Sequence, residues 1–223
     1  MFASIAPRYD VANRVLTAGV DESWRRRAVR ELAVPGAGAV LDLCTGTGDL
    51  AFHLARSNAQ LRITAVDFCG PMLDAARGRA GREDAHQQIT FVEADVLSLP
   101  FAAGAFDGAT MGFSMRNVVD ITATLREIRR VLRPGARFVN LDVSKPKSPA
   151  VRRAFQLYFY GVVPLVGGIV GGSRAAYRYL PQSLTNYPDA QTLAGRFEDA
   201  GFTSVRVIRL GFGAIAIHVG VAP

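Results

Sequence analysis

The residues with the clearest chemical signature are two glycines that follow a buried strand and an aspartate that ends the next strand. Gly46 and Gly48 lie in VLDLCTGTGDL, where an apolar run over residues 40–43 breaks into a turn before a helix that opens at Asp49. Because glycine has no Cβ, backbone N–H groups and a helix N-terminus can come close to a ligand at such a turn. The next apolar run, residues 63–66, ends in Asp67, which is placed to accept hydrogen bonds from ribose hydroxyls. The pattern therefore predicts a cofactor that contains a nucleoside.

A further acidic position extends this cofactor site. Asp95 stands in FVEADVLSLPF, where VEAD ends a third strand-like run. We expect Asp95, together with the adjacent backbone of Val96, to hydrogen-bond an adenine amino group. The alternative is a solvated loop aspartate that only caps its own turn.

Alternating strands and helices are needed to bring these residues together. We expect strands over 40–43, 62–66, 89–92, 106–111 and 136–142, and helices over 49–57, 71–80 and 120–132. This alternation predicts an α/β fold in which a parallel sheet is covered by helices on both faces. Arg133-Pro134-Gly135 predicts a turn between the last of these helices and strand 136–142.

The C-terminal part predicts two more strands. A helix in QTLAGRFEDAG precedes strands 204–210 and 213–219, which only the segment GFG separates. A connection this short cannot hold a helical crossover, so these strands must be antiparallel. Seven strands ending in such a hairpin differ from a six-stranded nicotinamide-binding fold, and CTGTG does not match the pattern GxGxxG.

With the glycine turn, Asp67, Asp95 and the hairpin, the chain resembles the class I S-adenosylmethionine-dependent methyltransferases over nearly its whole length. Four stretches narrow the resemblance: YDVANRVLTAGVDESW at 9–24, RNV at 116–118, RRVLRPGARFVNLDVSKP at 129–146 and YRYLPQSLTNYPD at 177–189. Together and in this order, they resemble the UbiE/MenG/COQ5 family of quinone-biosynthesis C-methyltransferases. The resemblance implies a seven-stranded Rossmann-like sheet in a single domain 1–223, with a helical cap (1–34) and an apolar helical insertion (145–188) before strand 6.

The resemblance also implies an activity. Methyl transfer from S-adenosylmethionine to a ring carbon of a reduced prenylated quinone is expected, with demethylmenaquinol giving menaquinol in menaquinone biosynthesis. A benzoquinol of the ubiquinone pathway and a small molecule of secondary metabolism are alternative substrates. A non-catalytic S-adenosylmethionine-binding or RNA-associated protein is the alternative from another class, although it would need neither Arg116 nor the apolar insertion.

The roles that the resemblance implies fall into three groups. Arg116 is expected to face the cofactor and to stabilise a phenolate or orient a base water, and Asn117 is the second catalytic candidate. Hydrogen bonds to the substrate are expected from Tyr177 and Tyr179, although structural bonding between lid and sheet would explain these tyrosines equally well. The expected cofactor-binding residues are Gly46, Thr47, Gly48, Asp67, Asp95, Val96, Gly112 and Tyr9.

The chain departs from the family pattern at several positions. The family usually has His where this chain has Asp21, and Ser where it has Thr17. These departures leave the cofactor residues intact and leave the identity of the quinone open. The residues that normally precede FxxIAxxYD are missing, which leaves open a start upstream of Met1.

Residues 154–173 are free of charge for about the length of a membrane-spanning helix. Five glycines and Pro164 argue against such a helix, and a crossing there would separate the last two strands from the others. We instead expect an apolar lid for a polyprenyl tail, with Phe155 and Phe159 contacting the substrate and Arg152, Arg153 and Arg174 resting on anionic head groups. The alternative is a lid that merely packs on the core.

Amino-acid composition limits the partners, the metal content and the cellular location that we expect. The formal charge is +7, but the basic clusters lack interleaved aromatic residues, so we expect no nucleic-acid partner. The two cysteines, Cys44 and Cys69, form no paired framework, and the three histidines lack metal-ligand spacing, so we expect a reduced compartment and no metal. With no signal peptide visible, a cytoplasmic protein that associates peripherally with the inner face of the cell membrane is expected, and a homodimer is compatible with this reading.

Overall fold

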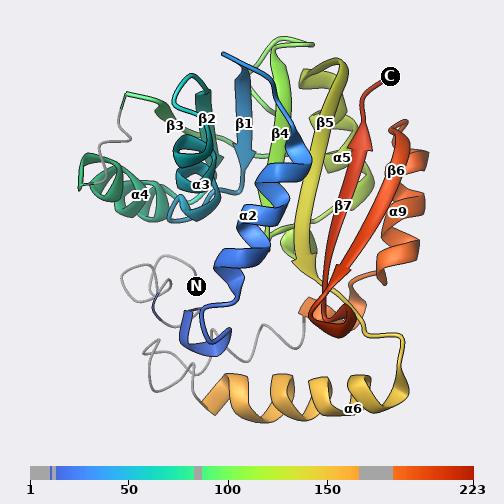
Figure 1. The fold of residues 1–223 in the computed structure, drawn as a ribbon. Coiled ribbons are helices and arrows are strands. Elements are labelled where there is room, and N and C mark those ends of the chain that lie inside the picture. Colours follow the sequence, from blue (N-terminus) through green and yellow to red (C-terminus); the bar gives the residue numbers. More distant parts are fainter. Residues whose placement is uncertain (1–10, 12–13, 83–86, 166–182) are drawn as a thin grey trace.

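The computed structural model describes residue 11 and residues 14–82, 87–165 and 183–223, which form a seven-stranded sheet flanked by helices (Figure 1). The strand order is β3-β2-β1-β4-β5-β7-β6; β7 pairs antiparallel with both β5 and β6, and the other pairings are parallel. The predicted α/β sheet with a C-terminal antiparallel hairpin is therefore confirmed. The strands are β1 (Ala39–Leu43), β2 (Arg62–Asp67), β3 (Ile89–Glu93), β4 (Phe106–Gly112), β5 (Leu132–Val143), β6 (Thr203–Leu210) and β7 (Ile215–Val221).

Helices cover both faces of the sheet because the chain adds strands on one side of β1 first and on its other side afterwards. The connections through α3 (Asp49–Ser57) and α4 (Gly70–Arg82) lead outward from β1 to β2 and β3, whereas α5 (Ile121–Val131) leads from β4 to β5. Right-handed crossovers in opposite directions place their helices on opposite faces. Helix α9 (Ala190–Asp199) packs beside α5.

Successive side chains of each strand point to opposite faces of the sheet and form two separate hydrophobic cores. On the α5 and α9 face, the ring of Phe138 stacks on that of Phe197, with 5.4 Å between centroids. On the other face, Val40 and Val139 pack with Phe52 of α3. This burial on both faces explains why the central strands are continuously apolar, as the sequence predicted.

The largest difference from the sequence-based elements concerns β5. It begins at Leu132 rather than at residue 136, so the predicted turn Arg133-Pro134-Gly135 lies inside the strand. The register against β4 shifts between the Phe106–Leu132 and Gly108–Arg137 pairs. Pro134 and Gly135 therefore form a bulge, an interruption that proline and glycine favour in strands.

Helix α6 (Pro149–Leu157) lies beyond the edge of the sheet where the parallel strands end, and α2 (Asp21–Leu32) runs across one face of the sheet toward that edge (Figure 1). Helix α2 crosses β4 and β5 and packs beside α3, which confirms a helical N-terminal cap for the part of the cap that is described. Helix α6 continues into the π-helical turn η3 (Tyr158–Val162), so the described part of the insertion is also helical.

No helix within the described ranges is both long and apolar enough to cross a membrane.

Candidate functional site

Asp67 on the neighbouring strand fixes the glycine turn between β1 and α3 through hydrogen bonds to backbone N–H groups. Gly46 has a φ of +57°, and a Cβ built on it would meet nothing within 4 Å, so its backbone faces open space. The Gly46 N–H donates to Oδ2 of Asp67 over 2.8 Å, and the Cys69 N–H donates to Oδ1 over 2.9 Å. Gly48, with a φ of +89°, is the N-cap of α3. The turn and Asp67 thus form one unit, as the parallel pairing of β1 and β2 requires.

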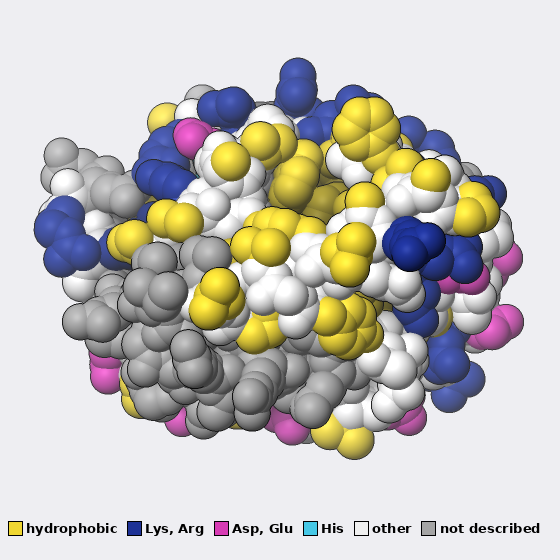
Figure 2. All heavy atoms as spheres, turned by 90° about the horizontal axis from the view of Figure 1, so that it is seen from below, with side chains coloured by type: hydrophobic (Ala, Val, Ile, Leu, Met, Phe, Trp, Pro, Cys, Tyr) yellow, Lys and Arg dark blue, Asp and Glu magenta, His cyan; other side chains and the backbone are white. Residues whose placement is uncertain are grey.

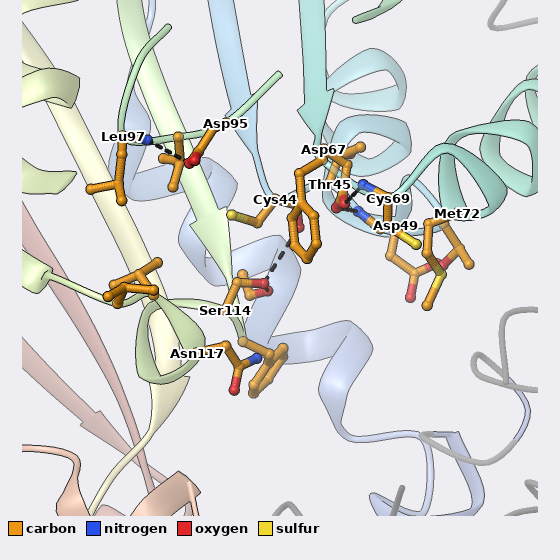
Figure 3. A pocket seen from close by; sticks show the side chains of 18 of the residues that line it. Cys44, Thr45, Asp49, Asp67, Cys69, Met72, Asp95, Leu97, Ser114 and Asn117 are labelled. Carbon is orange, nitrogen blue, oxygen red and sulfur yellow. Dashed lines mark hydrogen bonds between the residues drawn. The ribbon is translucent and has the colours of Figure 1, made fainter. Parts of the chain in front are cut away.

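A cleft of about 290 Å³ opens at this turn, at the carboxyl ends of β1, β2 and β4, and we call it the strand-end cleft (Figure 3). Burial raises the pKa of Asp67 in its wall, although the N–H groups of Cys69, Gly46 and Phe68 oppose the rise. Its lining includes six of the residues expected to bind the cofactor: Gly46, Thr47, Asp67, Asp95, Val96 and Gly112. Tyr9 lies outside the described residues.

Asp95 caps its own turn, which was the alternative to adenine binding, and it also lines the strand-end cleft. Its Oδ1 accepts the N–H of Leu97 over 2.9 Å and so caps its own turn (Figure 3). The side chain is nevertheless exposed along the wall of the strand-end cleft. Capping therefore fixes the orientation of a carboxylate that a ligand can still reach.

Two charged residues that line the strand-end cleft, Arg25 and Asp49, escaped the sequence analysis, as did Arg79, which pairs with Asp49. Asp49 accepts Nη1 of Arg79 over 2.7 Å and lies 3.3 Å from Nη2 of Arg25. Burial raises the pKa of Asp49, but the Arg25 and Arg79 guanidiniums outweigh this effect and hold the pKa below its usual value. The segment WRRRAVR predicts a basic helix, but no pattern in the neighbouring sequence shows that Arg25 contacts α3.

Asp42 was also missed, since it stands inside an apolar strand. Its carboxylate is 1% exposed and accepts the hydroxyls of Thr45 over 2.6 Å and Thr110 over 2.7 Å. Burial raises its pKa to about 6, although both hydroxyls and Arg25 oppose the rise. An aspartate in the middle of a buried strand is the signal that could have identified it, because such a charge needs partners.

A second hollow of about 320 Å³, the apolar cavity, lies beside the strand-end cleft and shares Arg25 and Phe113 with it. Its apolar walls come from the N-terminal cap, the insertion and the β6–β7 turn. The two expected substrate-binding phenylalanines, Phe155 and Phe159, both line it, and their rings stack with centroids 5.0 Å apart. The charged side chains among its described lining are Asp21, Arg25 and Arg116.

Arg116 lines the apolar cavity and is absent from the lining of the strand-end cleft, so its expected orientation toward the cofactor stays a prediction. Its Nη1 donates to Oδ1 of Asp142 over 2.6 Å and to the carbonyl of Phe113 over 2.6 Å. Asp142 on β5 therefore draws the guanidinium away from the strand-end cleft.

Asn117, the next residue, does line the strand-end cleft (Figure 3). Its Oδ1 is buried and has no hydrogen-bond partner among the described residues. A buried amide oxygen usually has a hydrogen-bond partner, and the described residues supply none here, so the role of Asn117 stays a prediction. Tyr177, Tyr179 and Arg174 lie outside the described residues.

The Cys44 thiol is poorly suited to nucleophilic chemistry at this site. Burial raises the pKa of the Cys44 thiol, which disfavours the reactive thiolate. Within the part of the chain that the structure describes, no three His, Cys, Asp or Glu side chains are grouped to hold a metal.

Comparisons with known proteins agree with this geometry. The model of the ubiE/COQ5 methyltransferase family matches residues 1–222. A demethylmenaquinone methyltransferase of Thermus thermophilus is 44% identical, over the full length of both chains. A ubiquinone/menaquinone biosynthesis C-methyltransferase of Desulfotalea psychrophila is 42% identical, over 99% of this chain and 88% of the relative.

Solved structures share the fold. A SAM-dependent methyltransferase of Thermotoga maritima superposes with a TM-score of 0.70 at 18% identity, over the full length of both chains. One of Aquifex aeolicus gives a TM-score of 0.66 at 17% identity, over 89% of each chain. At such identities the likeness concerns the fold alone.

Proposed function

This chain belongs to the ubiE/COQ5 family of S-adenosylmethionine-dependent methyltransferases, and we propose that it methylates a ring carbon of demethylmenaquinol to give menaquinol. The observation that carries this proposal is the apolar cavity, which meets the strand-end cleft at Arg25 and Phe113. A methyl donor in the cleft and an apolar acceptor in the cavity would thus be neighbours. The name of the Thermus relative supports the naphthoquinol ring.

A benzoquinol is the second candidate substrate. The Desulfotalea relative carries a name that includes ubiquinone as well as menaquinone biosynthesis, and it is nearly as similar as the Thermus relative. The two rings differ in size and in their oxygen substituents, so their turnover separates the two candidates.

The strand-end cleft suits S-adenosylmethionine, whose sulfonium supplies an electrophilic methyl group when it is bound. The open backbone at Gly46 allows close approach, and Asn117 would contribute to the wall beside the cofactor. Asp67 would accept the ribose hydroxyls, and Asp95 and Val96 would contact the adenine. Gly46, Thr47 and Gly112 would form the floor beneath the cofactor, with Tyr9 as a further contact. Gly48 is outside the cleft lining and packs against Phe52, so it would act only through the shape of the turn.

The apolar cavity would hold the quinol ring and the start of its tail. Its mostly apolar walls would replace much of the water around a bound ring, which would strengthen electrostatic interactions with the ring. Arg116, fixed by Asp142, would stabilise negative charge on the phenolic oxygen as the proton leaves. Phe155 and Phe159 would contact the tail, while Tyr177 and Tyr179 would donate hydrogen bonds to the ring oxygens.

We also propose that the protein works at the inner face of the cell membrane, because its substrate carries a prenyl tail. Hydrophobic side chains gather on the face that carries α6, with Lys and Arg around them (Figure 2). Among the described residues of the insertion, the large exposed apolar side chains are Leu157, Tyr158, Tyr160, Val162 and Leu165. Beside them is a basic groove lined by Lys145, Lys147, Arg152 and Arg209, together with Asp189, whose carboxylate already caps α9. Anionic head groups match this charge.

The test of the proposed function is methyl transfer from radiolabelled S-adenosylmethionine to a panel of reduced demethylated quinones. Turnover of the naphthoquinol, with a product heavier by one methylene unit, is the expected result. Turnover of benzoquinols alone would assign the second candidate. Methylation of neither ring, with both tested in detergent, would refute quinol methylation.

A further inference from the structure

We propose that Asp21 is the general base that takes the phenolic proton from the quinol. This inference rests on the proposed quinol methylation and adds the proton acceptor that this reaction needs. Asp21 is the first residue of α2, and its side chain is only 7% exposed. It lines the apolar cavity and is the one carboxylate in the cavity's described lining.

The other polar side chains of that lining are unsuited to accept a proton. Arg25 and Arg116 carry guanidiniums, which stay protonated in proteins and can only donate. Tyr158 donates its hydroxyl to the carbonyl of Leu16, and burial raises the pKa of its phenol. Thr17 donates its hydroxyl to Asp21 itself. Proton acceptance within the described lining therefore falls to Asp21.

The contacts of Asp21 orient the carboxylate and leave one oxygen available. Its Oδ1 accepts the Thr17 hydroxyl over 2.7 Å. Its Oδ2 lies 3.6 Å from Nε of Arg25, which exceeds hydrogen-bond length. Arg25 also turns Nη2 toward Asp49, so Asp21 does not hold this guanidinium alone. Oδ2 can thus accept a hydrogen bond from a hydroxyl in the cavity.

The position of Arg25 explains why the base would act beside the methyl donor. Arg25 lines both hollows and lies between Asp49 in the strand-end cleft and Asp21 in the apolar cavity. A quinol whose hydroxyl contacts Asp21 would place its ring near the junction of the two hollows. General-base catalysis needs this kind of contact with the proton that is removed.

The proposed step balances as follows. Oδ2 of Asp21 takes the hydroxyl proton, and the electron pair of the O–H bond moves into the ring. The ring carbon uses the displaced pair to bond the methyl carbon, while the pair of the broken carbon–sulfur bond stays on sulfur. The ring carbon then loses its hydrogen as a proton to water, and Asp21 returns its own proton to the phenolic oxygen. One methyl group has replaced one ring hydrogen.

The test compares two carboxylates with the same i,i+4 arginine spacing. Asp21→Asn keeps the shape and can still accept the Thr17 hydroxyl, but it cannot take a proton. We expect kcat to fall by about 10²- to 10⁴-fold, with unchanged affinity for S-adenosylmethionine. Glu22→Gln is the matched control, because Glu22 pairs with Arg26 on the exposed side of α2 with 45% of its side chain exposed. It should keep wild-type turnover.

A second measurement follows the proton without methyl transfer. Ionisation makes the ring carbon basic, so wild-type protein with S-adenosylhomocysteine should exchange the ring hydrogen of the quinol for deuterium in D₂O. Asp21→Asn should lose this exchange, and formate should restore turnover to Asp21→Ala by supplying a carboxylate.

The possible results separate this inference from the proposed function. Unchanged kcat and exchange in Asp21→Asn, or a loss of cofactor affinity that matches the loss of turnover, would overturn the role of Asp21 alone. A wild-type protein that neither methylates nor exchanges any quinol would overturn the proposed function as well.

Discussion

Arg116 and Asp142 form an ion pair that is almost completely withdrawn from solvent. Nη1 of Arg116 lies 2.6 Å from Oδ1 of Asp142, and the side chains are 5% and 2% exposed. The backbone N–H of Arg116 donates to the other carboxylate oxygen over 3.2 Å. Because both carboxylate oxygens contact the same residue, the guanidinium keeps a fixed orientation at the wall of the apolar cavity.

Because of this ion pair, Arg116→Ala would lower the stability of the fold as well as the rate of methyl transfer. Removing one partner of a buried pair leaves the other charge uncompensated, so the free energy of unfolding should fall by about 3–5 kcal/mol. Arg116→Lys keeps the charge and should fold and bind cofactor, but it should lower kcat because a point charge replaces the planar fork. Urea denaturation and steady-state kinetics provide both measurements.

The control is Arg77→Ala, which removes a partner of the exposed pair with Asp74. Exposed pairs contribute about 0–1 kcal/mol, so this variant should stay close to wild type. Wild-type turnover by Arg116→Lys would remove the need for the guanidinium in the reaction.

Asp67→Ala should weaken S-adenosylmethionine binding by about one to two orders of magnitude, as expected for the loss of charged hydrogen bonds. Truncation also frees the N–H groups of Gly46 and Cys69, so the glycine turn should loosen. Titration calorimetry measures the affinity. Glu93→Ala is the control, because Glu93 is the register partner of Asp67 on β3 and is exposed outside the cleft. Equal affinities in the two variants would remove Asp67 from the site.

Asp42 should make stability depend on pH. Its pKa rises from 3.8 to about 6 on folding, so between these values the folded state keeps a proton that the unfolded state has lost. The stability of the wild type relative to Asp42→Asn is therefore highest at low pH and falls as the pH rises through about 6. One pKa unit corresponds to about 1.4 kcal/mol, so the change should be about 3 kcal/mol. Denaturation of both proteins from pH 4 to 8 measures it, and parallel stability curves would contradict it.

Replacing Phe155 and Phe159 together by serine should impair turnover of long-tailed quinols more than turnover of a tail-free analogue. Both rings line the apolar cavity, and burial of apolar surface against a tail contributes about 25 cal/mol per Å². Leu157→Ser, assayed in detergent so that membrane contact plays no part, is the control, because Leu157 lies between them in sequence but is 69% exposed and outside the cavity. Equal losses on both substrates would show that the two phenylalanines serve only the packing of the insertion.

The protein should bind reversibly to vesicles that contain anionic lipids, and less so at high salt. Each Lys or Arg near such a surface contributes about 1 kcal/mol, and salt screens this attraction. Lys147→Gln with Arg209→Gln, both in the basic groove, should release protein in a flotation assay. Arg77→Gln with Arg206→Gln alters two exposed cations outside the groove and should not. Similar release by both pairs would assign the binding to net charge alone.

Local sequence determined the elements of the sheet and the core of the cofactor site. Gly46 and Asp67 lie at the ends of consecutive parallel strands, so the strand pattern alone brings them to one edge. The pattern failed at Pro134 and Gly135, because residues that favour a turn can also form a bulge when neighbouring strands hold them in place. Pairing of distant strands is not encoded in the local pattern.

Only the tertiary structure decided which charges meet. Arg116 was identified from the motif that carries it, but its partner Asp142 lies 26 positions away on another strand. Arg25 reached Asp49, and Asp21 came to line the apolar cavity, because α2 packs across β4 and β5 beside α3. The path of a helix over a sheet depends on the packing of both surfaces, whereas spacing along the chain fixes only which residues share one face of the helix.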